Sequence, residues 1–270
     1  MDDAELVTFL QRMAPRLDLR WRGLRRVRGQ VRKRLSRRLQ ALGLEDLAAY
    51  EDHLEAHPEE RRVLDGLCRI TITRFHRDRA VWQWLQAHEL PRLCRSARAT
   101  GRPALHAWSA GCASGEEPYT LSLLWDLAPA LHCEGVGLGV IATDADAALL
   151  ARAHAGEYPR GTLKELPRAW IEAAFEPADD VLRLRDLHRG RVRFEVQDLR
   201  ERMPSGPFDL IFCRNLAFTY FADGLQRRIL AELRDRLDAG GVLVVGAHEA
   251  LPDRAGLIPL TTDGTLWQRA

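Results

Sequence analysis

The stretch "WSAGCASGEEPYT", residues 108–120, constrains the fold more than any other part of the chain. The apolar run "ALHAWSAG" enters Gly111, and a helix-forming segment follows Gly115 directly. A glycine turn between a strand and a helix is the ligand-binding turn of doubly wound parallel sheets. We therefore expect a strand–loop–helix unit whose loop receives a nucleoside-containing ligand.

The same loop does not match either phosphate-binding pattern. A P-loop needs lysine and then serine or threonine after its last glycine, and a dinucleotide loop needs a third glycine. Here Glu116 and Glu117 follow Gly115. Acids at a helix N-terminus occupy the place that a phosphate would take, although they also favour the helix dipole on their own account. The pattern argues against ATP and NAD.

S-adenosylmethionine (SAM) fits these demands, because it has a ribose diol and two positive groups but no phosphate. A second strand, "GVGLGVIATD", ends at Asp144, where an acid can accept hydrogen bonds from both ribose hydroxyls. Helix capping is the alternative role for Asp144, and Asp146 competes for that position. Together with the strand "AGGVLVVG", the pattern predicts a Rossmann-like sheet of the SAM-dependent methyltransferase type.

Helices and strands alternate from about residue 80, which predicts a mostly parallel sheet with helices on both faces. The sequence divides into a helical domain over residues 1–72 and a SAM-binding domain over residues 73–270. Period-two alternation in "VLRLRDLHRGRVRFEV" predicts a small antiparallel β-insertion at about 168–195, turning at His188-Arg189-Gly190. No apolar run reaches the roughly 18 residues of a membrane span, so we expect no membrane insertion.

The N-terminal region reads as helices. Its main helix carries an apolar stripe at spacings of three and four, and we expect it to end at Gly43. The stripe consists of Leu24, Val27, Val31, Leu35, Leu39 and Leu42. Two shorter helices, broken near Pro58, follow in "LEDLAAYEDHLEAHPEERRVLDGLCRI".

Basic residues cluster in this main helix and just before it. Between Arg12 and Arg38 there are twelve basic residues and one acid, Asp18. A nucleic-acid groove would need interleaved aromatic residues, and only Trp21 is near, so we expect no nucleic-acid partner. Two interpretations stay open: a solvated helix face, and a surface that docks an acidic partner helix.

The cysteines and histidines show no metal-ligand spacing, and we expect no metal site. The five cysteines (Cys68, Cys94, Cys112, Cys133 and Cys213) are scattered and are interpreted as reduced core thiols in a cytoplasmic protein. His76, next to Arg77, is either a general base for an alcohol, phenol or amine acceptor or a packing residue.

Five blocks of sequence resemble the chemotaxis receptor methyltransferases (the CheR family) over nearly the whole chain. They are "ITITRFHRD", "WSAGCASGEEPYT", "IATDADAALL", "GPFDLIFCRNLAFTYF" and "GGVLVVGAHEAL". The resemblance implies an enzyme that uses SAM to esterify glutamate side chains on receptor signalling helices and releases S-adenosylhomocysteine. It also favours the docking interpretation of the basic helix. We expect a cytoplasmic monomer.

The resemblance implies a site, residue by residue. Thr73 and Arg77 border the SAM site, Glu117 lies near the methionyl ammonium, and Asp144 holds the ribose. The further cofactor contacts that it implies are Gly111, Ala113, Asp198, Leu199, Asn215 and Leu216. Arg77 is expected to orient the acceptor carboxylate, and Tyr220 to line the transfer site. A carboxylate with a pKa of about 4 is ionised at neutral pH and needs no general base, so the enzyme's tasks are alignment and exclusion of water.

The sequence departs from the family pattern mainly around the acceptor. "RFHRD" has His76 where the family has a second phenylalanine, "LAFTYF" after Asn215 is one residue longer than the common form, and "GAHEAL" changes the positions of His248 and Glu249. Two alternatives therefore stay open. The chain could methylate a small molecule or a carrier-bound acid, or it could be a catalytically silent module that binds SAM.

Overall fold

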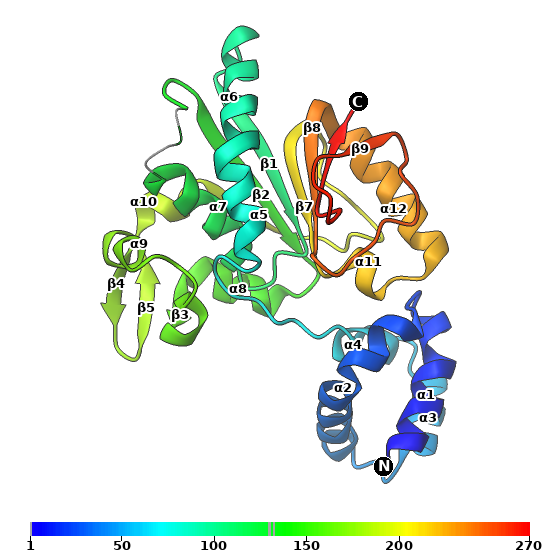
Figure 1. Cartoon of the computed structure of the whole chain (residues 1–270). Coiled ribbons are helices and arrows are strands. Elements are labelled where there is room, and N and C mark those ends of the chain that lie inside the picture. Colours follow the sequence, from blue (N-terminus) through cyan, green and yellow to red (C-terminus); the bar gives the residue numbers. More distant parts are fainter. Residues whose placement is uncertain (1, 129–130, 132) are drawn as a thin grey trace. The chain divides into compact units, whose positions relative to one another are not determined.

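The computed structural model describes residues 2–128, 131 and 133–270, and it consists of two compact units (Figure 1). The first unit holds the chain up to Ile72 together with Leu216–Arg227. The second unit holds Thr73–Asn215 and Arg228–Ala270. The first unit thus includes a late segment that local sequence patterns do not single out.

The first unit is helical, as the sequence predicts. Its helices are α1 (Asp3–Arg16), α2 (Trp21–Leu42), α3 (Leu47–Ala56), α4 (Glu60–Cys68) and the short α11 (Ala217–Tyr220). A capping box between Asp2 and Glu5 starts α1. Gly43 ends α2 with a left-handed φ of 68°, which confirms the predicted stop. Four members of the predicted stripe, Leu24, Val31, Leu35 and Leu39, are buried.

The late segment of this unit is held by the start of α2. The Arg20 amide donates to the carbonyl of Tyr220 at 2.7 Å, and the Ala222 amide donates to the carbonyl of Asp18 at 2.8 Å. The Arg20 guanidinium also donates to the carbonyl of Thr219 at 3.1 Å. Residues immediately after the "FCRN" motif are therefore part of the helical unit.

Gly23 makes this contact possible, and it offers a matched test. A Cβ at Gly23 would lie 2.3 Å from the carbonyl oxygen of Thr219, whereas a Cβ at Gly29 on the same helix would meet nothing within 4 Å. We expect Gly23→Ala to lower the free energy of unfolding by about 1–3 kcal/mol through overpacking. Gly29→Ala should raise it by up to about 1 kcal/mol through helix propensity. Thermal unfolding followed by circular dichroism measures the stability of both variants. If the two substitutions change the free energy of unfolding equally, Gly23 is not packed closely against Thr219.

The second unit contains a seven-stranded mixed sheet in the order β6-β2-β1-β7-β8-β10-β9. The strands are β1 (Ala104–Ala110), β2 (Gly137–Asp144), β6 (Val192–Val196), β7 (Phe208–Cys213), β8 (Leu237–Val245), β9 (Leu257–Pro259) and β10 (Leu266–Arg269). Pairings from β6 to β8 are parallel, and those of β10 are antiparallel. The chain leaves β1 toward β6 and returns to β7 on the other side of β1, which creates a topological switch point there.

Helices cover this sheet (Figure 1). They are α5 (Arg79–Trp84), the π-helical turn η1 (Leu85–Glu89), α6 (Leu90–Ala99), α7 (Glu116–Leu127), α8 (Ala147–Ala155) and α12 (Asp223–Arg236), which begins in the first unit. Three further elements contact α7 or the smaller sheet described below: the 3₁₀ turn η2 (Arg160–Leu163), α9 (Arg168–Ala174) and α10 (Asp186–Arg189). Trp82 and Leu93 of the α5–α6 run pack in one apolar cluster with Leu105 and Phe212 of the sheet. Among the described residues, no helix has both the length and the apolar character that a membrane crossing needs.

A small antiparallel sheet confirms the predicted insertion, but the predicted turn is wrong. Its strands are β3 (Glu157–Pro159), β4 (Phe175–Ala178) and β5 (Val181–Leu184), in the order β3-β5-β4. The hairpin turns between Ala178 and Val181 rather than at His188-Arg189-Gly190. The residues after that triplet form β6, which pairs parallel with β2 at the edge of the large sheet. An edge strand with one exposed face has the same period-two pattern as an antiparallel hairpin, so alternation alone does not identify the partner strand.

The prediction of five reduced cysteines is wrong for two of them. Cys94 on α6 and Cys133 form a disulfide across 39 residues of sequence, whereas Cys68, Cys112 and Cys213 are free and buried. The pair comes together because α6 packs beside the approach to β2. Sequence spacing contains no signal for a contact of this kind.

Candidate active site

The strands of the large sheet bring most predicted site residues to one edge. The amides of Gly111 and Cys112 donate to the carbonyl of Thr143 at 2.8 and 3.0 Å, and the Gln197 amide donates to the carbonyl of Asp144 at 3.0 Å. These bonds join the carboxyl ends of β1, β2 and β6 at the switch point beside β7. Ligands of open α/β sheets bind at this position.

Packing against Ala153 and Tyr158 fixes the glycine loop. Gly115 has a φ of 91°, and a Cβ there would lie 3.0 Å from the Cβ of Ala153 and 3.1 Å from the hydroxyl of Tyr158. The Tyr158 hydroxyl donates to the carbonyl of Ser114 at 2.7 Å. Gly115 is therefore required by packing beneath the loop, and its geometry sets the start of α7.

The two acids of the loop have different roles. Glu116 is buried, and Ser114 Oγ lies 2.9 and 3.0 Å from its two carboxylate oxygens. Burial raises the pKa of Glu116, and hydrogen bonds, including those from Ser114 and Thr73, oppose the shift. Glu116 is thus part of the loop's scaffold, and Thr73 contacts that scaffold.

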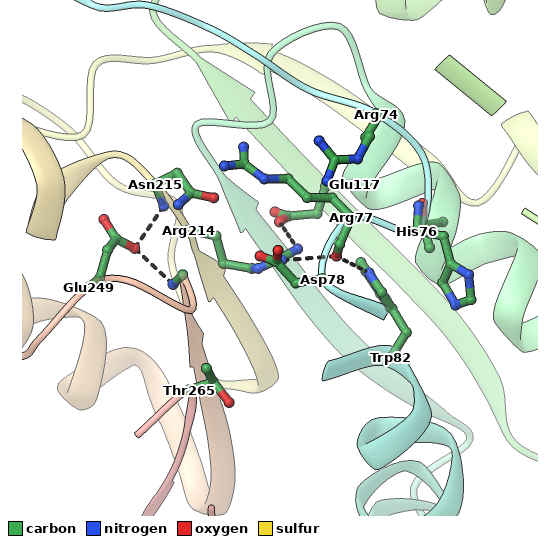
Figure 2. Close-up of polar contacts among 12 residues, drawn as sticks. Arg74, His76, Arg77, Asp78, Trp82, Glu117, Arg214, Asn215, Glu249 and Thr265 are labelled. Atoms are coloured by element: carbon green, nitrogen blue, oxygen red, sulfur yellow. Dashed lines mark hydrogen bonds and ion pairs between the residues drawn. The ribbon is translucent and has the colours of Figure 1, made fainter. Parts of the chain in front are cut away.

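Glu117 has different partners from Glu116 and remains partly accessible. Its carboxylate accepts from Ser109 Oγ at 2.7 Å. It also accepts from Arg214 at 3.0 Å (Figure 2). Each oxygen of a carboxylate has two acceptor positions, so both can still accept from a ligand cation. Of the two glutamates that argue against a phosphate, Glu117 is the more accessible one.

The competition between Asp144 and Asp146 is resolved by geometry. Asp146 caps α8, accepting from the amides of Ala148 and Leu149. Asp144 instead accepts from the amide of Ala113 at 2.9 Å through Oδ2 and from the amide of Asp146 at 2.9 Å through Oδ1. These two bonds hold its carboxylate against the glycine loop.

Asp198 and Leu199 follow β6, at the next strand along. The carboxylate of Asp198 accepts from the amide of Arg200 at 2.9 Å and from its guanidinium at 2.6 Å. Leu199 is buried. The Asp198 carboxylate thus has a fixed orientation.

Left-handed backbone concentrates at this edge. Non-glycine residues with positive φ include His76 (56°), Asp78 (58°), Ala113 (52°) and Asn215 (59°). This conformation costs about 1–2 kcal/mol per residue with a Cβ, and it persists where surrounding contacts enforce it. Arg77 lies between two such residues, half-buried, and its carbonyl accepts from Trp82 Nε1 at 2.9 Å.

The environment of His76 favours the packing interpretation. The ring is buried beside Trp82 and Trp170, its Nδ1 lies 3.1 Å from the carbonyl oxygen of Glu165, and burial lowers its pKa. A neutral ring that contacts a backbone carbonyl stabilises the conformation of residues 74–78.

Asn215 is supported by an acid whose role the sequence left undefined. Glu249 is buried, and one of its oxygens accepts from the amide of Asn215 at 2.7 Å and from the amide of Gly246 at 2.8 Å (Figure 2). Leu216 and Tyr220 belong to the first unit, where the Tyr220 hydroxyl donates to the carbonyl of Ile70 at 3.3 Å. Catalysis by Tyr220 stays a prediction.

Four residues of this network were not predicted from the sequence: Ser109, Asp78, Arg214 and Glu249. Arg214 carries the clearest signal, because it is a charged residue directly after the wholly apolar end of a central strand. Its partner Glu117 is 97 residues away, so local patterns do not connect the two.

The residues present fit a cofactor that has a nucleoside and positive charge. The glycine loop offers carboxylates rather than the lysine that phosphates require, and Asp144 lies where doubly wound sheets bind a ribose. Fold and site together define a Rossmann-type SAM-dependent methyltransferase.

Comparison with known proteins agrees with this class. The model of the CheR methyltransferase SAM-binding domain matches residues 71–262, and that of the CheR all-alpha domain matches residues 27–64. A chemotaxis protein methyltransferase of Listeria innocua is 33% identical over 189 residues, 69% of this chain and 68% of that protein. One from Pseudomonas aeruginosa is 31% identical over 237 residues (82% and 81%), and one from Salmonella typhimurium is 33% identical over 230 residues (82% and 76%).

The chain therefore belongs to the CheR methyltransferase family. It is a SAM-dependent enzyme, and the sequence-based assignments of fold class and cofactor are confirmed.

Proposed function

We propose that the protein transfers the methyl group of SAM to glutamate side chains on the signalling helices of chemoreceptors. SAM supplies an electrophilic methyl group, and the products are a glutamate methyl ester and S-adenosylhomocysteine. The observation that carries the proposal is the pairing of an acid-lined nucleoside site, Glu117 and Asp144, with relatives named chemotaxis protein methyltransferases. We further propose that the enzyme acts as a cytoplasmic monomer.

Each site residue has a defined task under this proposal. Glu117 meets the methionyl ammonium, Asp144 the ribose hydroxyls, and Asp198 and Leu199 the adenine. Further cofactor contacts come from Thr73, Arg77, Gly111, Ala113, Asn215 and Leu216. Arg77 orients the ionised acceptor carboxylate, and Tyr220 lines the transfer site. No general base is needed, since the acceptor is already ionised at neutral pH.

Transfer from tritiated SAM to a receptor cytoplasmic fragment tests the function. We expect label on the fragment that mild base releases as volatile methanol. Calorimetric binding of SAM without transfer to any acceptor would support the silent module instead. Label that appears in a small acid or a carrier-bound acid, and not in the fragment, would support the other methyltransferase alternative.

We propose that α2 docks the receptor through its basic face. Six of its basic side chains are exposed and have no carboxylate partner among the described residues: Arg22, Arg25, Arg26, Arg32, Lys33 and Arg37. Receptor methylation helices are rich in glutamate, so these side chains would steer association.

Charge reversal on α2 tests this docking surface. We expect Arg25→Glu/Arg26→Glu to raise the KM for the receptor fragment on the order of tenfold, most strongly at low salt. The KM for SAM should not change. The same reversal on exposed Arg95 and Arg98 of α6 is the matched control. If both double variants raise the receptor KM equally, general charge rather than docking on α2 is responsible.

A further inference from the structure

Arg214 is a buried guanidinium at the centre of the site. It follows the last residue of β7, its side chain is only 3% exposed, and it stacks 5.8 Å from the ring of Trp82. Neither the sequence patterns nor the roles assigned above give it a task. A buried arginine is expected to be paired, and the identity of its partners indicates what it does.

Its partners come from both halves of the proposed site. Nη1 donates to Glu117 at 3.0 Å, on the side assigned to the cofactor. Nη2 donates to Asp78 at 2.7 Å and to the carbonyl oxygen of Arg77 at 3.0 Å, on the side assigned to the acceptor (Figure 2). One planar group thus joins the start of α7 to the turn at residues 76–78.

That turn needs such support. His76 and Asp78 both have left-handed backbone, with φ of 56° and 58°, and Arg77 lies between them. Arg214 and Trp82 Nε1 both donate to the Arg77 carbonyl. Holding the carbonyl fixes the direction in which the Arg77 side chain leaves the turn.

We propose that Arg214 is a positioning residue that sets Glu117 for the cofactor and the Arg77 turn for the acceptor at the same time. The inference rests on the roles proposed above for Glu117 and Arg77. Its planar fork can serve two carboxylates and a carbonyl together, whereas the ammonium of a lysine is a point charge. A lysine at this position should therefore preserve the positioning of Glu117 for the cofactor and lose the positioning of the Arg77 turn for the acceptor.

Three variants of the full-length chain test the proposal, each with calorimetric Kd for SAM, kcat on the receptor fragment and thermal unfolding. We expect Arg214→Gln to weaken SAM binding and to lower kcat, each at least tenfold. Arg214→Lys should recover SAM affinity to within threefold while kcat stays at least tenfold low. Asp78→Asn, at a side chain that is 27% exposed, should lower kcat about tenfold and leave the Kd for SAM within threefold.

The results separate this inference from the proposed function. A folded Arg214→Gln with both constants within threefold of wild type overturns it. The inference is also overturned if Arg214→Lys and Asp78→Asn both lose SAM affinity and kcat in equal proportion, because general destabilisation has that result. If Arg214→Gln does not fold, the Kd for SAM and the kcat of Arg214→Lys and Asp78→Asn test the inference. If wild type transfers nothing to the fragment, the proposed function fails, yet the predicted effects on SAM Kd are still measurable.

Discussion

Replacing Arg77 with alanine should lower kcat for methyl transfer to a receptor fragment at least tenfold, while the protein remains folded. Arg77 is held half-buried in a left-handed turn, and we assign it to the acceptor carboxylate. Losing a charged contact of about 1.5–3 kcal/mol corresponds to roughly 10- to 150-fold in rate. Single-turnover transfer at saturating SAM measures the effect directly.

Arg79→Ala is the matched control, because Arg79 lies two residues away, is exposed, and donates to the carbonyl of Glu165 at 3.3 Å. We expect its rate within twofold of wild type. If Arg77→Ala transfers methyl groups within threefold of wild type, Arg77 does not orient the acceptor.

Replacing Asp144 with asparagine should weaken SAM binding by about 100-fold or more. The carboxylate is anchored by the amides of Ala113 and Asp146 and is assigned to both ribose hydroxyls. Two hydrogen bonds to a charged acceptor contribute about 3–6 kcal/mol together, and an amide can accept on one side only. Calorimetric titration with SAM gives the Kd, and it needs no acceptor.

Asp146→Asn is the control with the same chemical change two residues away. Asparagine caps helices as well as aspartate does, so α8 should keep its start and the Kd for SAM should stay within threefold. Equal weakening by the two variants would mean that the ribose assignment of Asp144 is wrong and that the loop responds to any change at this strand end.

The elements that local periodicity determines were predictable from the sequence. The glycine loop with its flanking strand and helix, the parallel sheet, the helical N-terminal domain and the end of α2 at Gly43 follow from residue types a few positions apart. The placement of the antiparallel turn was wrong, because β6 is an edge strand and has the same alternation as a hairpin. The alternation of apolar and polar residues shows which face of a strand is exposed, but it does not show which strand is its partner.

The site was predictable only where a motif or a resemblance pointed to it. The resemblance pointed to Asp144 and Glu117, whose roles stay predictions, whereas local patterns alone do not separate Asp144 from Asp146 as cap, or Glu116 from Glu117 as ligand. Those choices depend on the orientation of each side chain in the folded protein. The pairing of Arg214 with Glu117 and the disulfide of Cys94 with Cys133 join residues 97 and 39 positions apart, and only the tertiary fold brings them together.

The most direct test of the account is to locate the transferred methyl group. Incubation of the enzyme with SAM and a receptor signalling fragment, followed by tandem mass spectrometry of its peptides, identifies the modified residue. We predict one added methyl group on a glutamate side chain, removed by mild base and absent when that glutamate is changed to alanine. A base-stable methyl group on any other residue, or an unmodified fragment with a SAM-derived methyl group on a small acid, would contradict the account.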